Sequence, residues 1–126
     1  MKRLYTVLAL TAFGAALAIA QDKPAAAPTR EFKSVNIEVK GQKIWVPSVF
    51  IVKKGDKVKI TLVNTAPSGV HAFAIDGYGD AAKTTVDNKD GDNTKTIEFV
   101  ADKAGLFRVF CPMHPPHVGG QLLVLE

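Results

Sequence analysis

Four side chains in this sequence are able to bind a metal through nitrogen or sulfur. They are the single cysteine, Cys111, and the three histidines, His71, His114 and His117. Taken singly, a cysteine in a β-protein is most often a buried apolar residue, and a histidine on an apolar face is most often structural. Here one thiol and two imidazoles follow one another within seven residues of a single segment. That spacing favours a metal site.

The segment that carries these side chains contains three prolines, Pro112, Pro115 and Pro116. Proline fixes φ and lacks a backbone N–H, so the segment is unable to continue a β-ladder as a central strand. A stiff loop also loses little conformational entropy when its side chains are held in one geometry. The sequence therefore predicts a preorganised loop that displays Cys111, His114 and His117.

The ligand types favour copper over the alternatives. One thiolate with imidazoles and a weak axial donor is the ligand set of mononuclear copper sites for electron transfer. Zinc accepts the same groups, but structural zinc sites more often use paired cysteines, which this sequence lacks. A cysteine nucleophile activated by a histidine is a third interpretation. The proline directly after Cys111 makes attack by this thiol the least favoured of the three.

The residues that must position these side chains follow a period of two. In the segment 57–63, for example, Val58, Ile60 and Leu62 alternate with polar residues, so one side of the strand faces a core. Glycine-containing turns separate the alternating segments. We expect about seven strands, at 32–40, 44–52 (broken at Pro47), 57–63, 71–75, 94–100, 105–111 and 121–126. Short strands with frequent turns predict an all-β fold, a sandwich or a barrel.

The strand that ends at Cys111 and the long segment 77–93 have different expected structures. Cys111 shares its parity with Phe107 and Val109, so its sulfur is expected to point inward at the end of a strand. The segment 77–93 is rich in Asp, Asn, Gly and Lys, and we expect it to be an irregular, solvated loop.

The first 20 residues have the features of a signal peptide. Lys2 and Arg3 precede an almost wholly apolar stretch, which ends in Ala18-Ile19-Ala20. An uncleaved N-terminal anchor is the alternative. We expect residues 21–30 to form a flexible Pro/Ala linker, residues 31–126 to form the folded domain, and the protein to be periplasmic or secreted. No later stretch is long and apolar enough to span a membrane.

The charge balance argues against nucleic-acid binding. The whole chain has a formal net charge of +4, but removal of Lys2 and Arg3 leaves 14 basic and 12 acidic residues, a charge of +2. The remaining cations are scattered among acidic residues and form no basic stripe.

The sequence resembles the cupredoxin family over residues 49–126. The resemblance rests on the turn VKKGD at 52–56, on Asn64, on His71-Ala72-Phe73, on ADKAGLF at 101–107 before Cys111, and on Gly119-Gly120. It implies a Greek-key β-sandwich that binds one copper ion through His71, Cys111 and His114. The strands look most similar to those of nitrosocyanin, a red-copper member, whereas the C-x₂-H-P spacing looks like that of amicyanin.

The sequence departs from both patterns. His117 lies where blue-copper members have an axial methionine, which implies a site of one cysteine and three histidines; Met113, expected to face outward, is the alternative axial donor. Ala72 occupies a position where many members have asparagine. We therefore expect the hydrogen bonds that orient the ligands to come from the backbone or from Asn64, which is equally consistent with a simple turn residue.

The resemblance implies a one-electron carrier, not an enzyme, that meets a redox partner protein through the apolar surface of Pro115, Pro116 and Val118. A copper-handling protein and a redox catalyst on a small molecule are the alternatives. Four protein ligands leave little room for a substrate. We expect a monomer because the stretch 32–52 looks shorter than the corresponding hairpin of trimeric nitrosocyanin.

Overall fold

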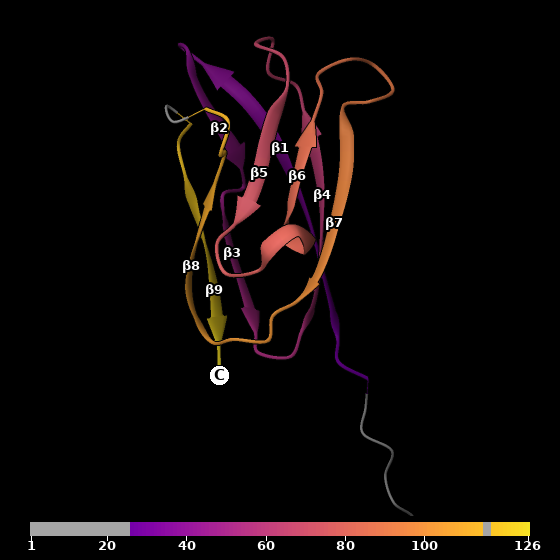
Figure 1. The fold of residues 1–126 in the computed structure, drawn as a ribbon, viewed down its shortest axis with the longest axis vertical. Helices are drawn as coiled ribbons and strands as arrows, with labels where there is room; N and C mark the ends of the chain where they lie inside the picture. The colour runs from indigo at the N-terminus through magenta and orange to yellow at the C-terminus, as the bar shows by residue number, and fades with distance from the viewer. Residues whose placement is uncertain (1–25, 115–116) are drawn as a thin grey trace, which may run out of the picture.

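The computed structural model describes residues 26–114 and 117–126. The expected signal peptide, the first part of the expected linker, and the two loop residues Pro115 and Pro116 lie outside the described residues. The described chain contains nine strands and one 3₁₀ turn (Figure 1). They are β1 (Thr29–Val39), β2 (Gln42–Val46), β3 (Val49–Lys53), β4 (Lys57–Asn64), β5 (His71–Ile75), η1 (Gly79–Ala82), β6 (Lys83–Val86), β7 (Thr94–Val100), β8 (Gly105–Phe110) and β9 (Gly120–Leu125).

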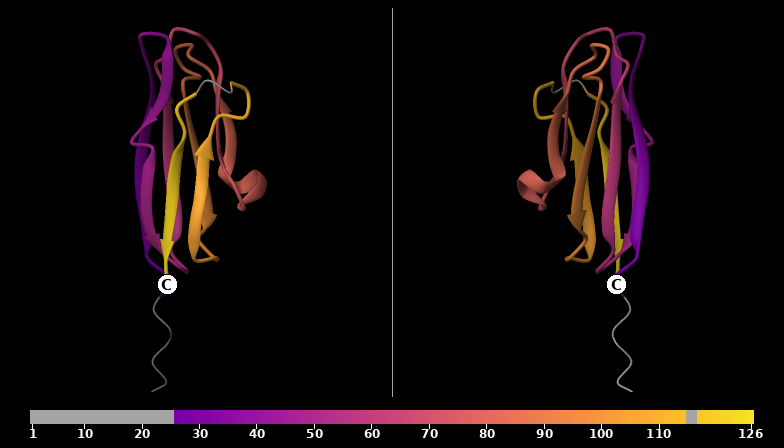
Figure 2. Two further views of the ribbon diagram at one scale, coloured as in Figure 1. Left: turned by 90° about the vertical axis from the view of Figure 1, so that its left-hand side faces the viewer. Right: turned by 90° about the vertical axis from the view of Figure 1, so that its right-hand side faces the viewer.

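The strands form two sheets that pack face to face, as the side views in Figure 2 show. One sheet has the order β2-β1-β4-β7 and the other has the order β3-β9-β8-β5-β6. Each sheet contains one parallel pair, β1 with β4 and β3 with β9, among antiparallel neighbours. The expected all-β sandwich is confirmed.

Alternation of apolar and polar residues fills the space between the sheets. On β4, Val58, Ile60 and Leu62 are buried and face residues of the second sheet such as Phe73 and Leu122, all at 0–1% exposure. Burying each such side chain stabilises the fold by about 1.5–3 kcal/mol relative to leaving it exposed. The core therefore makes the sandwich rigid beneath the strand ends.

The strand count differs from the expected seven for two reasons. The segment 44–52 is divided at Pro47, as expected, and its two halves join different sheets as β2 and β3. The second reason is a correction: the segment 77–93 is not wholly irregular, because it contains η1 and the edge strand β6. The sequence of β6 does not show the expected alternation of apolar and polar residues, because Lys83, Thr84 and Thr85 are all polar. The strand pairs with β5 along only one edge.

The folded part begins slightly before the expected boundary at residue 31. β1 begins at Thr29 and pairs in parallel with β4, with Thr29 opposite Lys57. Arg30 then donates a hydrogen bond from Nε to Oδ2 of buried Asp56, at 3.0 Å. Within the described residues, no helix is long and apolar enough to cross a membrane.

Three strand ends meet at one end of the sandwich. β5 begins there, β8 ends there and β9 begins there, at the top of Figure 1. His71 is the first residue of β5, and Cys111 directly follows β8. Two segments far apart in the sequence therefore present their side chains in the same place.

Candidate metal centre

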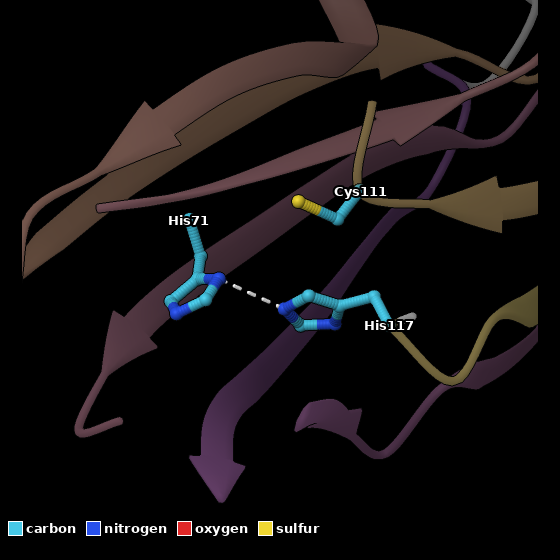
Figure 3. Close-up of side chains that lie close together, drawn as sticks. All are labelled: His71, Cys111 and His117. Atoms are coloured by element: carbon cyan, nitrogen blue, oxygen red, sulfur yellow. Dashed lines mark hydrogen bonds between the residues drawn. The ribbon is translucent and has the colours of Figure 1, made fainter. Parts of the chain in front are cut away.

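The structure brings His71, Cys111 and His117 together. One potential ligand atom from each residue lies within 4.8 Å of those of the other two. His71 and Cys111 are buried and His117 is half-buried. Figure 3 shows the three side chains pointing toward one another from the start of β5, the end of β8 and the loop before β9.

Both ring nitrogens of His71 have a neighbour. Its side chain is completely buried, at 0% exposure. Nδ1 lies 2.9 Å from Nε2 of His117, and Nε2 lies 3.0 Å from the Oγ atom of Ser68. The main chain of His71 pairs with Val86 of β6, so this unpredicted strand helps to fix the position of His71.

The Cys111 thiol lies inward, as its parity with Phe107 and Val109 predicts. It is 5% exposed, and its Sγ atom accepts a hydrogen bond from the backbone N–H of Ala72 at 3.4 Å. The backbone of Ala72 therefore connects the two segments that carry His71 and Cys111. This connection does not require the asparagine side chain that many family members have at this position.

The other two residues of the predicted site lie in the loop after β8. His114 lies beside the three-residue group, with Nδ1 3.7 Å from Cys111 Sγ and its ring centroid 4.7 Å from that of His71. The N–H of His117 donates to the carbonyl of His114 at 3.0 Å. Met113 is 49% exposed and faces solvent, as expected.

The hairpin of β1 and β2 supports the ligand loop from the side. The N–H of Val118 donates to the Lys43 carbonyl at 2.8 Å, and Ile44 forms a parallel bridge with Val118. The indole N–H of buried Trp45 donates to the carbonyl of Ala72 at 3.1 Å. Trp45, the only tryptophan in the sequence, was not among the residues expected to support the site.

Asn64 holds the loop before His71 and does not contact a ligand. Its Nδ2 atom donates to the carbonyls of Gly69 at 2.7 Å and Val86 at 2.9 Å. Its Oδ1 atom accepts from the N–H of Ala66 and from Nδ2 of Asn36, both at 3.1 Å. Asn64 thus orients the first histidine indirectly, by bracing the backbone around it.

The electrostatic environment favours neutral imidazoles. Burial lowers the pKa of His71, and the charges of His114 and Lys43 lower it further, against a smaller opposing effect of Glu38. Burial also lowers the pKa of His117 to about 4, with smaller contributions from His71, His114 and Lys43. Metals bind neutral imidazole, so both rings have the protonation state that a metal ligand requires.

The donor set fits a copper ion. A thiol and two imidazoles converge without a carboxylate among them, a combination of soft and borderline donors that suits copper or zinc better than magnesium or calcium. The Nδ1 atom of His117 is buried and has no hydrogen-bond partner among the described residues. This atom lies on the other side of the ring from Nε2, which faces His71, so the fit of a cation between the two rings rests on the donor types.

A pocket of about 510 Å³ adjoins the ligands on the outer side of β8. It is lined by Arg108, Phe110, Cys111, Pro112, His114, His117 and Gly119. The guanidinium of Arg108 lies 4.0 Å above the ring of Phe110 and donates to Asp76 at 3.0 Å. The candidate metal centre is therefore reachable from solvent on one side.

Solved structures with the same fold include several copper proteins. Copper nitrite reductase from Nitrosomonas europaea is 21% identical, with a TM-score of 0.62, and the match covers 77% of this chain but 41% of that one. This chain therefore spans less than half the length of that relative. Reduced auracyanin from Roseiflexus castenholzii is 17% identical, with a TM-score of 0.57, and the match covers 76% of this chain and 97% of that one.

At these identities the structures establish the fold alone. No curated protein matches the chain significantly. The family model that describes the cupredoxin-like domain, however, matches residues 8–124, which is most of the sequence. On that match, and on a two-sheet sandwich with a His71/Cys111/His117 candidate copper site, the chain belongs to the cupredoxin family.

Proposed function

We propose that this protein is an exported cupredoxin that binds one copper ion and carries single electrons between partner proteins. The observation that carries the proposal is the convergence of the Cys111 thiol and the His71 and His117 imidazoles within 4.8 Å at the rim of the sandwich. Thiolate and imidazole donors in this combination are typical of electron-transfer copper. When bound, the copper supplies the one-electron couple, and the protein supplies the ligands and their rigidity.

The ligand set that we propose includes His114 as the third imidazole. Its Nδ1 atom already lies 3.7 Å from Cys111 Sγ. With His117 in place of an axial thioether, the site has one cysteine and three histidines, which is closer to the red-copper nitrosocyanins than to blue-copper members. Imidazole is a harder donor than thioether and favours Cu(II) over Cu(I).

The protein's own contribution to electron transfer is a fixed geometry. Ala72 donates to Cys111, Trp45 donates to the carbonyl of Ala72, and Asn64 braces the loop before His71. Ligands held by such contacts change little between oxidation states, which keeps the reorganisation that accompanies transfer small. We propose no catalytic role for these residues.

Metal analysis with absorption and electron-paramagnetic-resonance spectra tests the copper site. We expect one copper per chain, an intense thiolate-to-Cu(II) absorption that is red, orange or green, and loss of that absorption in Cys111→Ser. A deep-blue spectrum that His117→Ala leaves unchanged would contradict the proposed ligand set. A reduced protein that is unable to pass an electron to any surrogate redox protein would contradict the carrier role.

Partner docking is proposed at the same end of the molecule. Met113 and Val118 are 49% and 46% exposed beside the ligands and give an apolar surface, next to Pro115 and Pro116 in the sequence. Redox encounters commonly use small interfaces, below about 1,200 Å². We propose a periplasmic or secreted monomer that meets its redox partner transiently there.

The pocket beside the ligands favours a second candidate function, a redox reaction on a small molecule. Its walls include Cys111, His114 and His117, and the Arg108 cation lies at its rim. Titration of the copper protein with azide or nitric oxide separates the two functions. A spectrum that does not respond supports the carrier, whereas a saturable change that Arg108→Gln weakens supports the reaction on a small molecule.

A further inference from the structure

We propose that Ser68 is a positioning residue for the metal centre, because its hydroxyl accepts the Nε2–H of His71 and thereby leaves the Nδ1 lone pair of that ring facing the other ligands. The inference rests on the proposed copper site for its effect on the metal. It rests on geometry alone for its effect on the histidine.

The hydrogen bonds of the His71 ring determine which of its nitrogens carries the proton. A neutral imidazole has one N–H and one lone pair, and the hydrogen bond at one nitrogen decides the state of the other. Ser68 Oγ lies 3.0 Å from Nε2, and His117 Nε2 lies 2.9 Å from Nδ1. With the proton of His71 on Nε2, its Nδ1 atom accepts from the Nε2–H of His117.

This assignment also accounts for the unpartnered atom in the site. If His117 carries its proton on Nε2, its Nδ1 atom is a bare lone pair, and this buried atom has no donor within reach in the part of the chain that the structure describes. The assignment thus directs a lone pair of His71 toward the other ligands, whereas His117 presents its Nε2–H there, so a cation held by both rings requires the His117 proton to move to Nδ1.

Ser68 is held in place by hydrogen bonds within its loop. The loop between β4 and β5 is fixed on both sides of this residue. The N–H of Ala66 donates to Asn64 Oδ1 at 3.1 Å, and the carbonyl of Gly69 accepts from Asn64 Nδ2 at 2.7 Å. Asn88 Nδ2 donates to the Ala66 carbonyl at 3.1 Å. Ser68 is itself solvent-exposed, so substitutions there leave the core intact.

A hydrogen-bond acceptor at the distal N–H of a ligating histidine fixes its orientation and raises its basicity as a donor. Loss of such a partner lowers metal affinity by about 10–100-fold. A more basic imidazole favours the cupric over the cuprous ion, so removal of the hydroxyl is expected to raise the reduction potential.

A matched pair of variants isolates the hydroxyl. Ser68→Thr keeps the Oγ atom, whereas Ser68→Val has the same shape without it; Ser68→Ala serves as a second variant that removes the hydroxyl. In the metal-free protein, ¹⁵N-detected NMR is expected to show His71 as the Nε2–H form in wild type and Ser68→Thr. In Ser68→Val and Ser68→Ala, the two tautomers are expected to mix and the Nε2 proton to exchange at least tenfold faster.

The copper-loaded proteins provide the second measurement. In Ser68→Val and Ser68→Ala, the affinity for Cu(II) is expected to fall about tenfold relative to the affinity for Cu(I). For a one-electron couple, this change raises the reduction potential by about 59 mV. Ser68→Thr is expected to match wild type. The inference is wrong if His71 has the same tautomer and the same Nε2 proton exchange rate in all four proteins. It is also wrong if Ser68→Val has the same reduction potential as wild type.

The two measurements separate this inference from the proposed function. A wild-type protein that shows the expected His71 tautomer but binds no copper contradicts the proposed function and leaves the role of Ser68 toward the ring supported. A protein that binds copper while its His71 tautomer is independent of position 68 contradicts only the inference.

Discussion

The Nε2 atom of His117 lies 2.9 Å from the Nδ1 atom of His71, although 46 positions separate the two residues in the sequence. A cation held by both rings must replace this hydrogen bond, so the loop before β9 and the start of β5 are directly coupled. His117 is thus both the partner of the first ligand and, in the proposed site, a ligand itself.

Replacement of His117 by methionine is expected to convert the site toward blue copper. A thioether is a softer donor than imidazole and stabilises Cu(I), so the potential of His117→Met should exceed that of wild type. Voltammetry and absorption spectra of the two copper proteins measure the shift. The prediction fails if the potential falls or if the spectrum moves away from the blue-copper form.

Gly119, directly before β9, and Gly120, its first residue, provide a matched pair of substitutions. A Cβ atom at Gly120 would overlap the backbone carbonyl of Ser48, whereas at Gly119 it would meet the Val109 carbonyl at 3.2 Å. Since neither obstacle is a flexible side chain, Gly120→Ala must move β9 away from β3. We expect it to lower the free energy of unfolding by about 3 kcal/mol and Gly119→Ala to cost less. Urea denaturation of both variants tests the order, and equal stabilities would contradict it.

The stability of the protein is expected to depend on pH through Asp56. The backbone N–H of Lys53 holds the pKa of this carboxyl below its ordinary value of 3.8, with further stabilisation of the charged form by the Arg30 guanidinium. The folded state therefore binds this proton less readily than the unfolded state. The stabilisation is complete above about pH 4 and is lost as pH falls toward the folded-state pKa.

Asp56→Asn is the variant that tests this dependence. We expect its unfolding free energy to change less than that of wild type between pH 6 and pH 3, as measured by urea denaturation. Asp90→Asn, at an exposed loop position, is the control and should keep the wild-type slope. An identical slope in Asp56→Asn and wild type would show that other carboxyls dominate acid unfolding.

Trp45 offers an optical probe of the centre. It is the single tryptophan, it is 2% exposed, and its indole N–H donates to the carbonyl next to His71. We expect blue-shifted emission that copper quenches in a saturable way with a stoichiometry of one. Emission that copper leaves unchanged would be inconsistent with a metal at the proposed site.

The hydrogen bond from the Trp45 indole to the Ala72 carbonyl is also expected to stabilise the fold. Trp45→Phe removes the donor and leaves the Ala72 carbonyl buried without this partner, which costs about 1–3 kcal/mol in addition to the lost packing. Chemical denaturation of the metal-free variant measures the cost. A smaller effect than that of Val39→Ala, at an exposed position in β1, would contradict a structural role for the indole.

Much of the fold was predictable because alternation determines which side chains are buried. The strand containing Val58, Ile60 and Leu62 was predicted within one residue of its observed bounds. β6 was missed because its short, polar edge sequence satisfies backbone hydrogen bonds along one side only and buries just Val86. Its pairing with β5 depends on a tertiary contact that local sequence does not encode.

The gathering of His71, Cys111 and His117 was foreseeable from residue type and from strand ends that meet at one edge. The supporting contacts were not. Ser68 lies in a Pro-Ser-Gly sequence that is typical of a turn, and no feature of the sequence around Trp45 indicates a role near the metal centre. Their hydrogen bonds depend on how the hairpin and the loop before β5 pack against the strand ends, which only the three-dimensional arrangement shows.

The parallel pairs β1 with β4 and β3 with β9 join strands that are far apart along the chain. To form such a pair, the chain between the two strands must close into a large loop, and this costs conformational entropy before any contact compensates for it. Sandwiches of this kind therefore fold in about milliseconds to seconds. Until then the thiol of Cys111 is accessible to oxidants and to any metal in solution. The protein should therefore refold in the presence of a reductant and a chelator first, and receive its copper afterwards.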